Sequence, residues 1–572
     1  MKLIFAVHKV LMKSSPVKLM ISILLLFIPL LLWSFKDTEL EDRPNIIIIM
    51  ADDLGFSDLG CYGGEIHTPN IDKLGYNGVR MNAFYNTSRC CPSRASLLTG
   101  LYPHQAGLGR MTHKTDLPGY QGTLDNNTVT IAEVLKKSGY QTGMVGKWHV
   151  SETPVRRTEE QLEWLAHQND YGDFSDTSTY PTSRGFEKYY GNIWGVVDYY
   201  DPFSLVNDKN QVKSVPQDYY HTTAIGDSAV AYVHQFSKKD NPFFLYVAHT
   251  APHWPLQAPD SVIAKYEERY KMGWKQIRAT RYQSLIEKGV IRSDTSLPYF
   301  MFPEREWRKN RDTLWDVHAM ATHAAMIDIL DQTVGNLLNE LEKTGELDNT
   351  IIFFLSDNGA SSERPSEYGP GFDRPGETRT GEKIQFPVEK DFLSGPQTVT
   401  SGIGPEWAHV ANTPFRYWKA RVYEGGITTP FIAHWPAGLT NKGDVIQNTA
   451  SHITDLMATC LDLAGAEYPK SFQGRYIKPT VGKSIMPILK RGDNQNSQKD
   501  YFWEHFGAAA LRSGDWKIVR LDAQSEWNLY NLKQDRTEVH NLSYQYPQRL
   551  NLMKEQWEKL ANQYQVYPAP TN

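Results

Sequence analysis

The chain has 572 residues, and its 60 Lys and Arg against 65 Asp and Glu leave a formal net charge of −5. This near balance gives no support to a nucleic-acid partner or to the coating of a polyanion. The length exceeds that of one compact domain and favours a large α/β unit with a smaller companion. With only four cysteines, Cys61, Cys90, Cys91 and Cys460, the composition argues against a disulfide scaffold.

The first predicted element is an export signal over residues 1–36. Four lysines precede an apolar run from Leu19 to Trp33, and the chain then turns polar at Lys36. The run is shorter than the about 20 residues of a membrane-spanning helix, so we predict cleavage, with an uncleaved membrane anchor as the alternative. We therefore expect an exported protein, and the few cysteines favour a bacterial periplasm or cell exterior.

Short apolar runs predict the strands of a mostly parallel sheet. Residues 45–50 form a continuous β-branched run, and comparable runs end at Val145, Ala248 and Leu355. Polar residues follow the end of each run. In open α/β sheets ligands bind at the carboxyl ends of the strands, so we expect these polar groups to converge in space.

Residues 90–100 predict a short helix with residue 90 at its N-terminus. Pro92 suits the first position of the helix, Leu97 supplies a buried face, and Gly100 is a typical residue just beyond a helix end. Unpaired N–H groups at the start of the helix favour an anion beside residue 90. The alternative is an ordinary short helix with two buried thiols, and Cys91 is predicted to pack because adjacent cysteines do not easily form a disulfide.

Asp52, Asp53, Asp357 and Asn358 follow two of the predicted strands and form a set of hard oxygen ligands. Such a set suits Ca²⁺ or Mg²⁺, whereas zinc would more often recruit His or Cys. Without a cation, clustered carboxylates would raise one another's pKa values. Taken alone, an Asp-Asp pair is more often a solvated turn.

Helical periodicity is clearest over residues 317–341 and 453–463, which are expected to cover the sheet. Residues 151–225, 256–315 and 360–412 have weak periodicity and many aromatic residues, which predicts long ordered loops that form pocket walls. From about Asp500 short strands and turns predict an antiparallel sheet, followed by a helix through Gln556. We therefore predict a catalytic α/β domain over 44–495 and an α+β subdomain over 496–572.

Several separate segments together resemble one enzyme family, the type I sulfatases of the alkaline phosphatase superfamily. They are Cys-x-Pro-Ser-Arg at residues 90–94, Gly-Lys-Trp-His at 146–149, Ser-Asp-Asn-Gly at 356–359, Lys-x-x-x-Tyr-Glu-Gly-Gly at 419–426, and the C-terminal segment at 528–542. The resemblance spans roughly residues 44–545 and is closest to bacterial arylsulfatases. It implies a large mixed sheet between helices, a smaller C-terminal antiparallel sheet with a helix, and a sulfuric ester hydrolase.

The resemblance implies a modified nucleophile and a metal ion. Cys90 would be oxidised to formylglycine by a maturing enzyme that acts as a transient partner, and its aldehyde hydrate would attack the sulfur of a sulfate ester. Residue 90, the Asp52-Asp53 pair, Asp357 and Asn358 would hold one divalent ion, Ca²⁺ or alternatively Mg²⁺. Asp357 would deprotonate the attacking hydroxyl.

The resemblance also implies how the other residues act on the sulfate. Lys147 and Lys419 would bind it, and Arg94 would hold the aldehyde hydrate. His149 would deprotonate the remaining hydroxyl and so release sulfate, and His253 would help Lys419 to protonate the departing alcohol. His249 is the competing candidate for the position of His253.

The predicted activity is therefore hydrolysis of a sulfate ester, either an aryl sulfate or a sulfated carbohydrate. One alternative is a formylglycine-dependent phosphonate monoester or phosphodiester hydrolase, and another is a binding protein for sulfated ligands if Cys90 stays a thiol. His505 is a candidate sugar contact. Other candidates for the pocket walls, for most of which core packing is the competing explanation, are Trp194, Tyr199, Tyr200, Trp254, Trp407, Tyr417 and Trp503.

Overall fold

The computed structural model describes residues 43–155, 158–170, 172–303, 305–307, 313–364, 376–378, 380–386, 388–389, 391–491 and 499–570. The predicted export signal over residues 1–36 lies outside these ranges. Among the helices that are described, none combines the length and the apolar character needed to cross a membrane.

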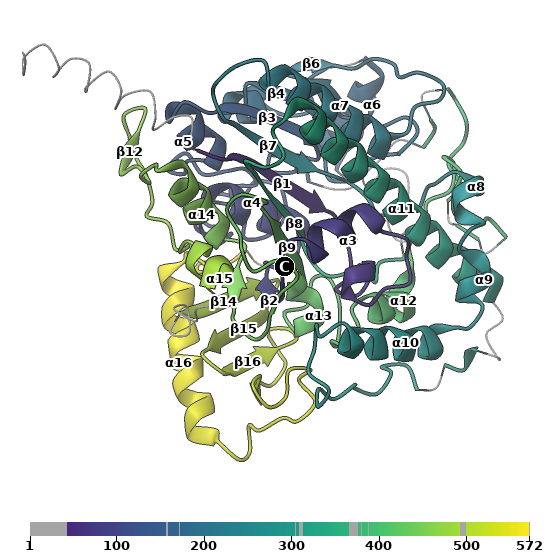
Figure 1. Ribbon diagram of the computed structural model, residues 1–572. Helices are drawn as coiled ribbons and strands as arrows, with labels where there is room; N and C mark the ends of the chain where they lie inside the picture. Colours follow the sequence, from purple (N-terminus) through teal and green to yellow (C-terminus); the bar gives the residue numbers. More distant parts are fainter. Residues whose placement is uncertain are drawn as a thin grey trace, which may run out of the picture.

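A mixed, mostly parallel sheet of 11 strands forms the centre of the protein (Figure 1). Its strand order is β10-β2-β9-β8-β1-β7-β3-β4-β5-β6, and β11 pairs with β2. The strands are β1 (Asn45–Ala51), β2 (Val79–Tyr85), β3 (Gln141–Gly146), β4 (Lys188–Asn192), β5 (Leu205–Asn207), β6 (Asn210–Gln211), β7 (Phe243–Ala248), β8 (Thr350–Ser356), β9 (Thr428–His434), β10 (Val445–Ile446) and β11 (Ser451–His452).

Helices cover both faces of this sheet, as β1 shows most clearly. Ile47 and Ile49 belong to a core shared with helices of one face, and Ile46 and Ile48 belong to a core shared with helices of the other. Successive side chains of a strand point to opposite faces, so a strand buried on both faces is apolar throughout. The first face carries α3 (Pro69–Tyr76), α7 (His221–Phe236) and α11 (Thr313–Thr344), and the second carries α4 (Cys90–Thr99), α5 (Ile131–Lys137) and α14 (Asp455–Ala464).

Strands β1, β3, β7 and β8 run parallel and in register, so their carboxyl ends lie along one edge of the sheet. Met50 pairs with both Ala248 and Leu355, and Val145 pairs with Val247. The segments that follow these four strands therefore meet at that edge, as the sequence predicts.

A second, four-stranded antiparallel sheet forms the C-terminal region, with the order β14-β15-β16-β17. Its strands are β14 (Asp500–His505), β15 (Ala508–Ser513), β16 (Trp516–Arg520) and β17 (Asn528–Asn531). One face packs on Tyr85 and Tyr423 of the main body, and the other packs on α16 (Pro547–Gln563) through Trp557 (Figure 1). The fold class predicted from the sequence is confirmed, whereas the last helix ends seven residues beyond the predicted Gln556.

The expected long loops contain helices that periodicity missed. They are α6 (Glu159–Asp170), α8 (Asp260–Ile263), α9 (Glu267–Tyr270), α10 (Trp274–Glu287) and α12 (Gly404–Ala411). The other α-helices in the described part of the chain are α13 (Glu424–Ile427) and α15 (Met486–Arg491). The buried face of α10 includes Arg278 and Arg281. Arg281 binds Asp58 at 2.7 Å and Glu65 at 2.7 Å, so charged residues take core positions and conceal the helical pattern.

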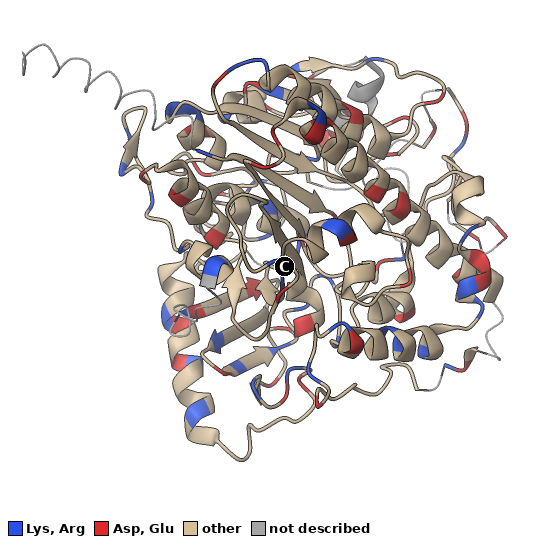
Figure 2. Ribbon diagram, viewed as in Figure 1, with Lys and Arg blue, Asp and Glu red and all other residues tan. Residues whose placement is uncertain are grey.

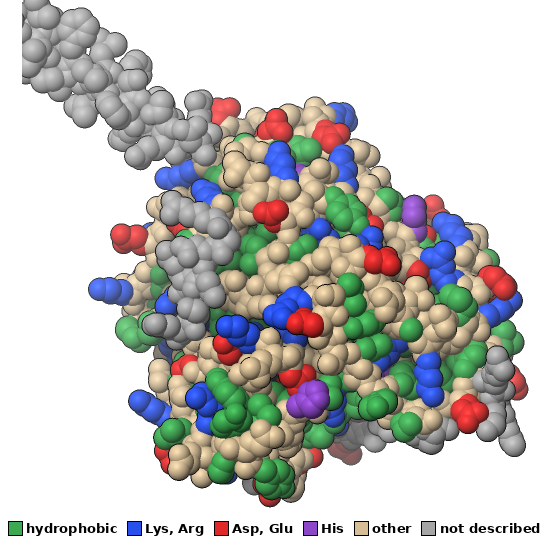
Figure 3. All heavy atoms as spheres, turned by 60° about the horizontal axis from the view of Figure 1, so that its bottom comes forward, with side chains coloured by type: hydrophobic (Ala, Val, Ile, Leu, Met, Phe, Trp, Pro, Cys, Tyr) green, Lys and Arg blue, Asp and Glu red, His purple; other side chains and the backbone are tan. Residues whose placement is uncertain are grey.

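Acidic and basic side chains are distributed over the helices and loops of both parts (Figure 2). On the face shown in Figure 3 the two charges are interspersed with apolar and neutral side chains. The surface in this view therefore presents a mixture of charges, in keeping with the balanced composition.

Candidate active site

Cys90 is the first residue of α4, and its side chain is buried at the C-terminal edge of the sheet. The residue before it, Arg89, is extended and caps the helix, and Gly100 ends the helix in the left-handed region with φ 69°. Residue 90 lies at the helix N-terminus and Gly100 ends the helix, both as expected, whereas Pro92 is the third residue of the helix and not the first. Burial raises the pKa of the Cys90 thiol, although Lys419 and Lys147 oppose the shift.

The carboxylates predicted to be ligands lie together beside Cys90. Asp52 and Asp53 follow β1, and Asp357 and Asn358 follow β8. The backbone N–H of Asp53 donates to Asp357 Oδ1 at 3.2 Å, and Asn358 Nδ2 donates to Asp53 Oδ1 at 2.6 Å. Arg94 joins them, since its Nη2 lies 2.9 Å from Asp357 Oδ2 and 3.4 Å from Asp52 Oδ2.

The two innermost carboxylates have opposite pKa shifts. Burial alone would raise the pKa of Asp52, but Lys147, His253 and Arg94 outweigh burial and lower it. Burial and the neighbouring charge of Asp52 together raise the pKa of Asp357 to about 7. The charge of Asp52 therefore disfavours ionisation of the Asp357 carboxyl beside it.

The same cluster fits a divalent cation. Potential ligand atoms of Asp52, Asp53, Cys90 and His253 all lie within 4.8 Å of one another. Asp52 Oδ1 and Asn358 Oδ1 are buried and have no hydrogen-bond donor among the described residues. Buried oxygens without a donor are costly unless something else satisfies them, and carboxylate and amide oxygens are the ligands that Ca²⁺ and Mg²⁺ prefer.

Two buried lysines adjoin the carboxylates. Lys147 follows β3 and contacts Asp52, while Lys419 Nζ lies 2.9 Å from Asp53 Oδ2. The loop of Lys419 is held by two backbone hydrogen bonds, one to Ala360 at 3.1 Å and one from Ala420 to Ser88 at 2.7 Å. Burial alone would lower the pKa of Lys419, but Asp53 raises it well above the usual value, so this lysine is charged.

His149 and His253 are both neutral imidazoles at the pocket. Burial and the charge of Lys147 hold the pKa of His149 well below its usual value, and Gly195 packs so closely on its ring that a Cβ there would lie 2.4 Å away. Burial and Lys419 lower the pKa of His253 to about 4. Its Nδ1 lies 2.5 Å from the Trp254 carbonyl oxygen, which can only accept, so Nδ1 carries the proton and Nε2 faces Asp53 at 3.6 Å.

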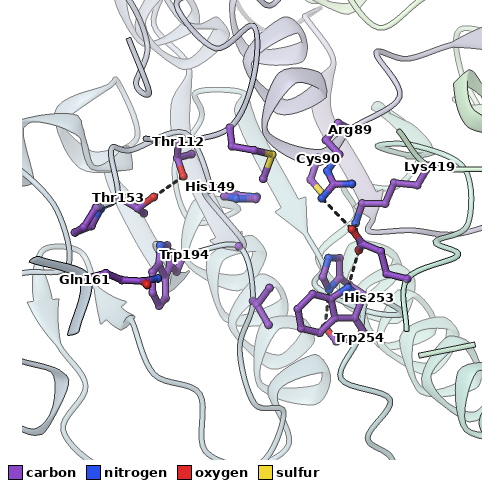
Figure 4. Close-up of a pocket in the computed structure, with 15 residues that line it drawn as sticks. Arg89, Cys90, Thr112, His149, Thr153, Gln161, Trp194, His253, Trp254 and Lys419 are labelled. Carbon is purple, nitrogen blue, oxygen red and sulfur yellow. Dashed lines mark hydrogen bonds and ion pairs between the residues drawn. The ribbon is translucent and has the colours of Figure 1, made fainter. Parts of the chain in front are cut away.

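Four of these groups, Cys90, His149, His253 and Lys419, line one pocket (Figure 4), whereas Lys147, Arg94 and the residues predicted to hold the metal are buried and are not part of its lining. In Figure 4, Arg89, Cys90, Lys419 and His253 lie on one side, and Thr112, Thr153 and Trp194 lie on the other. The described residues that line it are Arg89, Cys90, Met111, Thr112, His149, Thr153, Pro154, Gln161, Trp194, Gly195, Val196, His253, Trp254, Glu363 and Lys419.

Sequence reasoning missed two charged residues of the pocket, Arg89 and Glu363. Arg89 precedes the motif that identifies Cys90, and Glu363 lies in a segment without periodicity. The sequence offers one signal for each of them. Arg89 directly precedes Cys90, and Glu363 lies a few residues after the Ser-Asp-Asn-Gly segment.

Most of the other candidate residues do not line the pocket. Of the aromatic residues considered as pocket walls, Trp194 and Trp254 line the pocket, whereas Trp407 packs in the core and Trp503, in β14, packs between the C-terminal sheet and the main body. His249 is buried against α11, with Nε2 3.3 Å from Thr333 Oγ1. His505 ends β14, is buried, and is not among the residues that line the pocket.

Comparison with known proteins identifies the family. The sulfatase family model matches residues 44–466, and the model of the N-sulphoglucosamine sulphohydrolase C-terminal region matches residues 415–566. The chain belongs to the sulfatase family. It is therefore a hydrolase of sulfate esters, and the carboxylate cluster at Cys90 agrees with a sulfatase metal site.

Individual relatives support the same assignment. This sulfatase is 31% identical to an uncharacterised sulfatase of Schizosaccharomyces pombe over 94% of this chain and 97% of the relative. It is also 31% identical to an arylsulfatase of Klebsiella aerogenes over 78% and 92% of the two chains. A crystal structure of Ps i-CgsB in complex with k-i-k-neocarrahexaose superposes with a TM-score of 0.61 at 26% identity, and covers 91% of this chain and 92% of that one.

Proposed function

We propose that this sulfatase removes sulfate from a sulfated carbohydrate, with formylglycine made from Cys90 as its nucleophile. The observation that carries the proposal is the position of Cys90. It lies buried at the start of α4, in one cluster with Asp52 and Asp53, and lines a pocket with Lys419.

The nucleophile requires a maturing enzyme and a metal ion. Cys90 is the first residue of a helix, where N–H groups favour an anionic ester. When oxidised to formylglycine and hydrated, residue 90 offers two hydroxyls, one to attack sulfur and one to expel sulfate afterwards. Asp52, Asp53, Asp357 and Asn358 would hold a divalent ion, with Ca²⁺ preferred over Mg²⁺, and such an ion acidifies an oxygen nucleophile and offsets negative charge.

The charged residues of the chain stabilise the transferring sulfate group. Lys147 and Lys419 bind its oxygens, and Arg94, fixed by its contacts with Asp52 and Asp357, orients the side chain of residue 90. Each of these cations is buried, which strengthens its interaction with an anion relative to water.

Three residues move protons in the proposed reaction. Asp357 accepts the proton of the attacking hydroxyl, and a sulfated residue 90 results. His149 is neutral and can therefore accept the proton of the second hydroxyl, so that the aldehyde forms and sulfate leaves. His253 is neutral and its proton is on Nδ1, so the charged Lys419 delivers the proton to the departing alcohol oxygen, with His253 beside it.

The carbohydrate assignment rests on a relative and on the pocket wall. The structure of Ps i-CgsB holds an oligosaccharide, and here the indoles of Trp194 and Trp254 line the pocket. Indole faces pack well against the C–H faces of sugars. The predicted export signal suits such a substrate, because polysaccharides lie outside the cell, and we propose a periplasmic or extracellular location.

The test is a comparison of kcat/KM for protein produced together with a formylglycine-generating enzyme. Substrates are 4-nitrophenyl sulfate, bis-4-nitrophenyl phosphate and a panel of sulfated saccharides, with Cys90→Ala as control. We expect Cys90-dependent sulfate release, fastest on a saccharide. Faster cleavage of the phosphodiester would instead assign the protein to the formylglycine-dependent phosphodiester hydrolases.

A further inference from the structure

We infer that Glu363 and Arg89 recognise the alcohol half of the substrate, and that this half is a sugar ring with adjacent free hydroxyls and no second anionic group on that side. The inference rests on the proposed function and adds to it a substrate class and two specificity-determining residues. The resemblance to sulfatases assigned no role to either residue.

Glu363 is a nearly buried carboxylate, with 13% of its side chain exposed. Its Oε1 lies 2.9 Å from Arg89 Nη2. Its Oε2 accepts a hydrogen bond from the Trp254 indole at 2.8 Å and one from Ser361 Oγ at 3.2 Å, and lies 3.5 Å from Lys419 Nζ. The carboxylate is therefore fixed by groups from three other segments and by Ser361 of its own segment, a built arrangement at the pocket wall (Figure 4).

Glu363 is the one carboxylate among the described residues that line the pocket. A negative charge opposes the binding of a sulfate, so a pocket made only for sulfate would gain from its absence. The need to neutralise Lys419 does not explain the presence of Glu363, because Asp53 already lies 2.9 Å from that lysine. The Glu363 carboxylate is better explained as a group that binds the uncharged alcohol half of the substrate.

Arg89 and Glu363 place donors and acceptors side by side. Each hydroxyl of an adjacent pair on a sugar has one donor and two acceptor lone pairs, so the pair can accept from the guanidinium while it donates to the carboxylate. Trp254, held by the same carboxylate, supplies an apolar surface for the ring. A second sulfate at this position would meet the charge of Glu363, so the pair favours a sugar that carries only the reacting sulfate on this side.

The test compares matched substrates on the matured, full-length enzyme. Variants are Glu363→Gln, which keeps the shape but removes the charge, and Glu342→Gln, an exposed glutamate paired with Lys73 at 3.3 Å, as control. Substrates are 4-nitrophenyl sulfate, glucose 6-sulfate, galactose 6-sulfate and N-acetylglucosamine 6-sulfate. We expect Glu363→Gln to lower the ratio of kcat/KM on the best sugar to kcat/KM on the aryl sulfate by about tenfold or more, because a charged hydrogen bond to a hydroxyl is lost.

A binding measurement separates recognition from folding. In the Cys90→Ala background, calorimetry with the best sugar sulfate should show affinity about tenfold weaker for Glu363→Gln, while affinity for inorganic sulfate should stay equal or rise. An equal loss of kcat/KM on the sugar sulfate and the aryl sulfate would overturn the inference, as would an equal loss of affinity for the sugar sulfate and inorganic sulfate. Either result would mean that Glu363 only positions Lys419. An unchanged ratio would also overturn the inference, whereas failure of the proposed function would show as wild-type protein that releases no sulfate from any of these esters.

Discussion

Lys517 is a buried cation shared by two carboxylates, and its replacement should destabilise the protein. Its Nζ lies 2.8 Å from Glu424 Oε1 and 2.8 Å from Glu538 Oε1, and none of the three side chains is exposed. The backbone N–H of Glu424 donates to Glu538 Oε2 at 2.8 Å. Glu424 follows the loop of Lys419, so this network joins the C-terminal sheet to the loop that carries one of the proposed sulfate-binding lysines.

The stability that Lys517→Met should lose depends on which ion pairs remain in the network. Arg536 still contacts Glu424, so Glu538 is the carboxylate left without its ammonium partner. Breaking a buried ion pair costs about 3–5 kcal/mol, and because one carboxylate keeps a cation we expect the lower end, about 3 kcal/mol. Burial already raises the pKa of Glu538, and the loss of Lys517 raises it further.

The raised pKa of Glu538 determines how the stability of Lys517→Met depends on pH. A carboxyl group whose pKa is raised by folding takes up a proton more readily in the folded state, so stability falls as pH rises through the range between the two pKa values. The stability lost in Lys517→Met should therefore be larger at pH 8 than at pH 5.5. Equilibrium unfolding in urea, followed by tryptophan fluorescence, measures both losses.

Two further variants make this reasoning refutable. Lys343→Met removes an exposed lysine that lies 3.4 Å from Glu340, and should cost less than about 0.5 kcal/mol. Lys517→Met/Glu538→Gln should recover part of the lost stability at pH 8, because the unpaired charge is gone. A loss below about 1 kcal/mol for Lys517→Met, or no recovery in the double variant, would refute the argument.

Three other predictions concern the metal ion, the proposed base and acid stability. Treatment with EDTA should lower the Tm and abolish sulfate release, and Ca²⁺ should restore both, since the carboxylates around Asp52 would lose their counter-charge; an unchanged Tm and activity would contradict the proposed site. His149→Ala should lower kcat by about 10²–10⁴-fold and leave sulfated protein detectable by intact mass, whereas full activity without that species would exclude His149 as the base. Burial alone would raise the pKa of Asp58, but Arg281 and His323 lower it to about 2, so its contribution to stability is present above about pH 4 and is lost as pH falls toward 2. Asp58→Asn should flatten this acid limb in urea unfolding, and a curve parallel to wild type would contradict the assignment.

Much of the fold could be predicted because its central strands are apolar on both faces. The run Ile46 to Met50 reads as a strand without alternation, and its side chains do divide between two cores. Polar residues directly after such strands must lie at one edge, which is why Asp52 and Asp357 could be placed together from the sequence.

The sequence did not predict the helices whose buried face carries charged side chains. Helix α10 buries Arg278 and Arg281 on its inner face, so its apolar pattern is broken. Glu363 acquires its meaning only from contacts with Arg89 and Trp254, which are distant in sequence. His505 is buried at the end of β14 and is not among the residues that line the pocket, so its predicted sugar contact has no support from the pocket lining.

The central claim is that residue 90 acts as formylglycine, and peptide mass spectrometry combined with turnover tests it most directly. Preparations made with graded amounts of a formylglycine-generating enzyme should contain graded fractions of formylglycine in the peptide that holds residue 90. We predict that kcat for sulfate release rises in proportion to that fraction and is absent in Cys90→Ala. Full turnover by protein whose residue 90 is still a thiol would contradict the account.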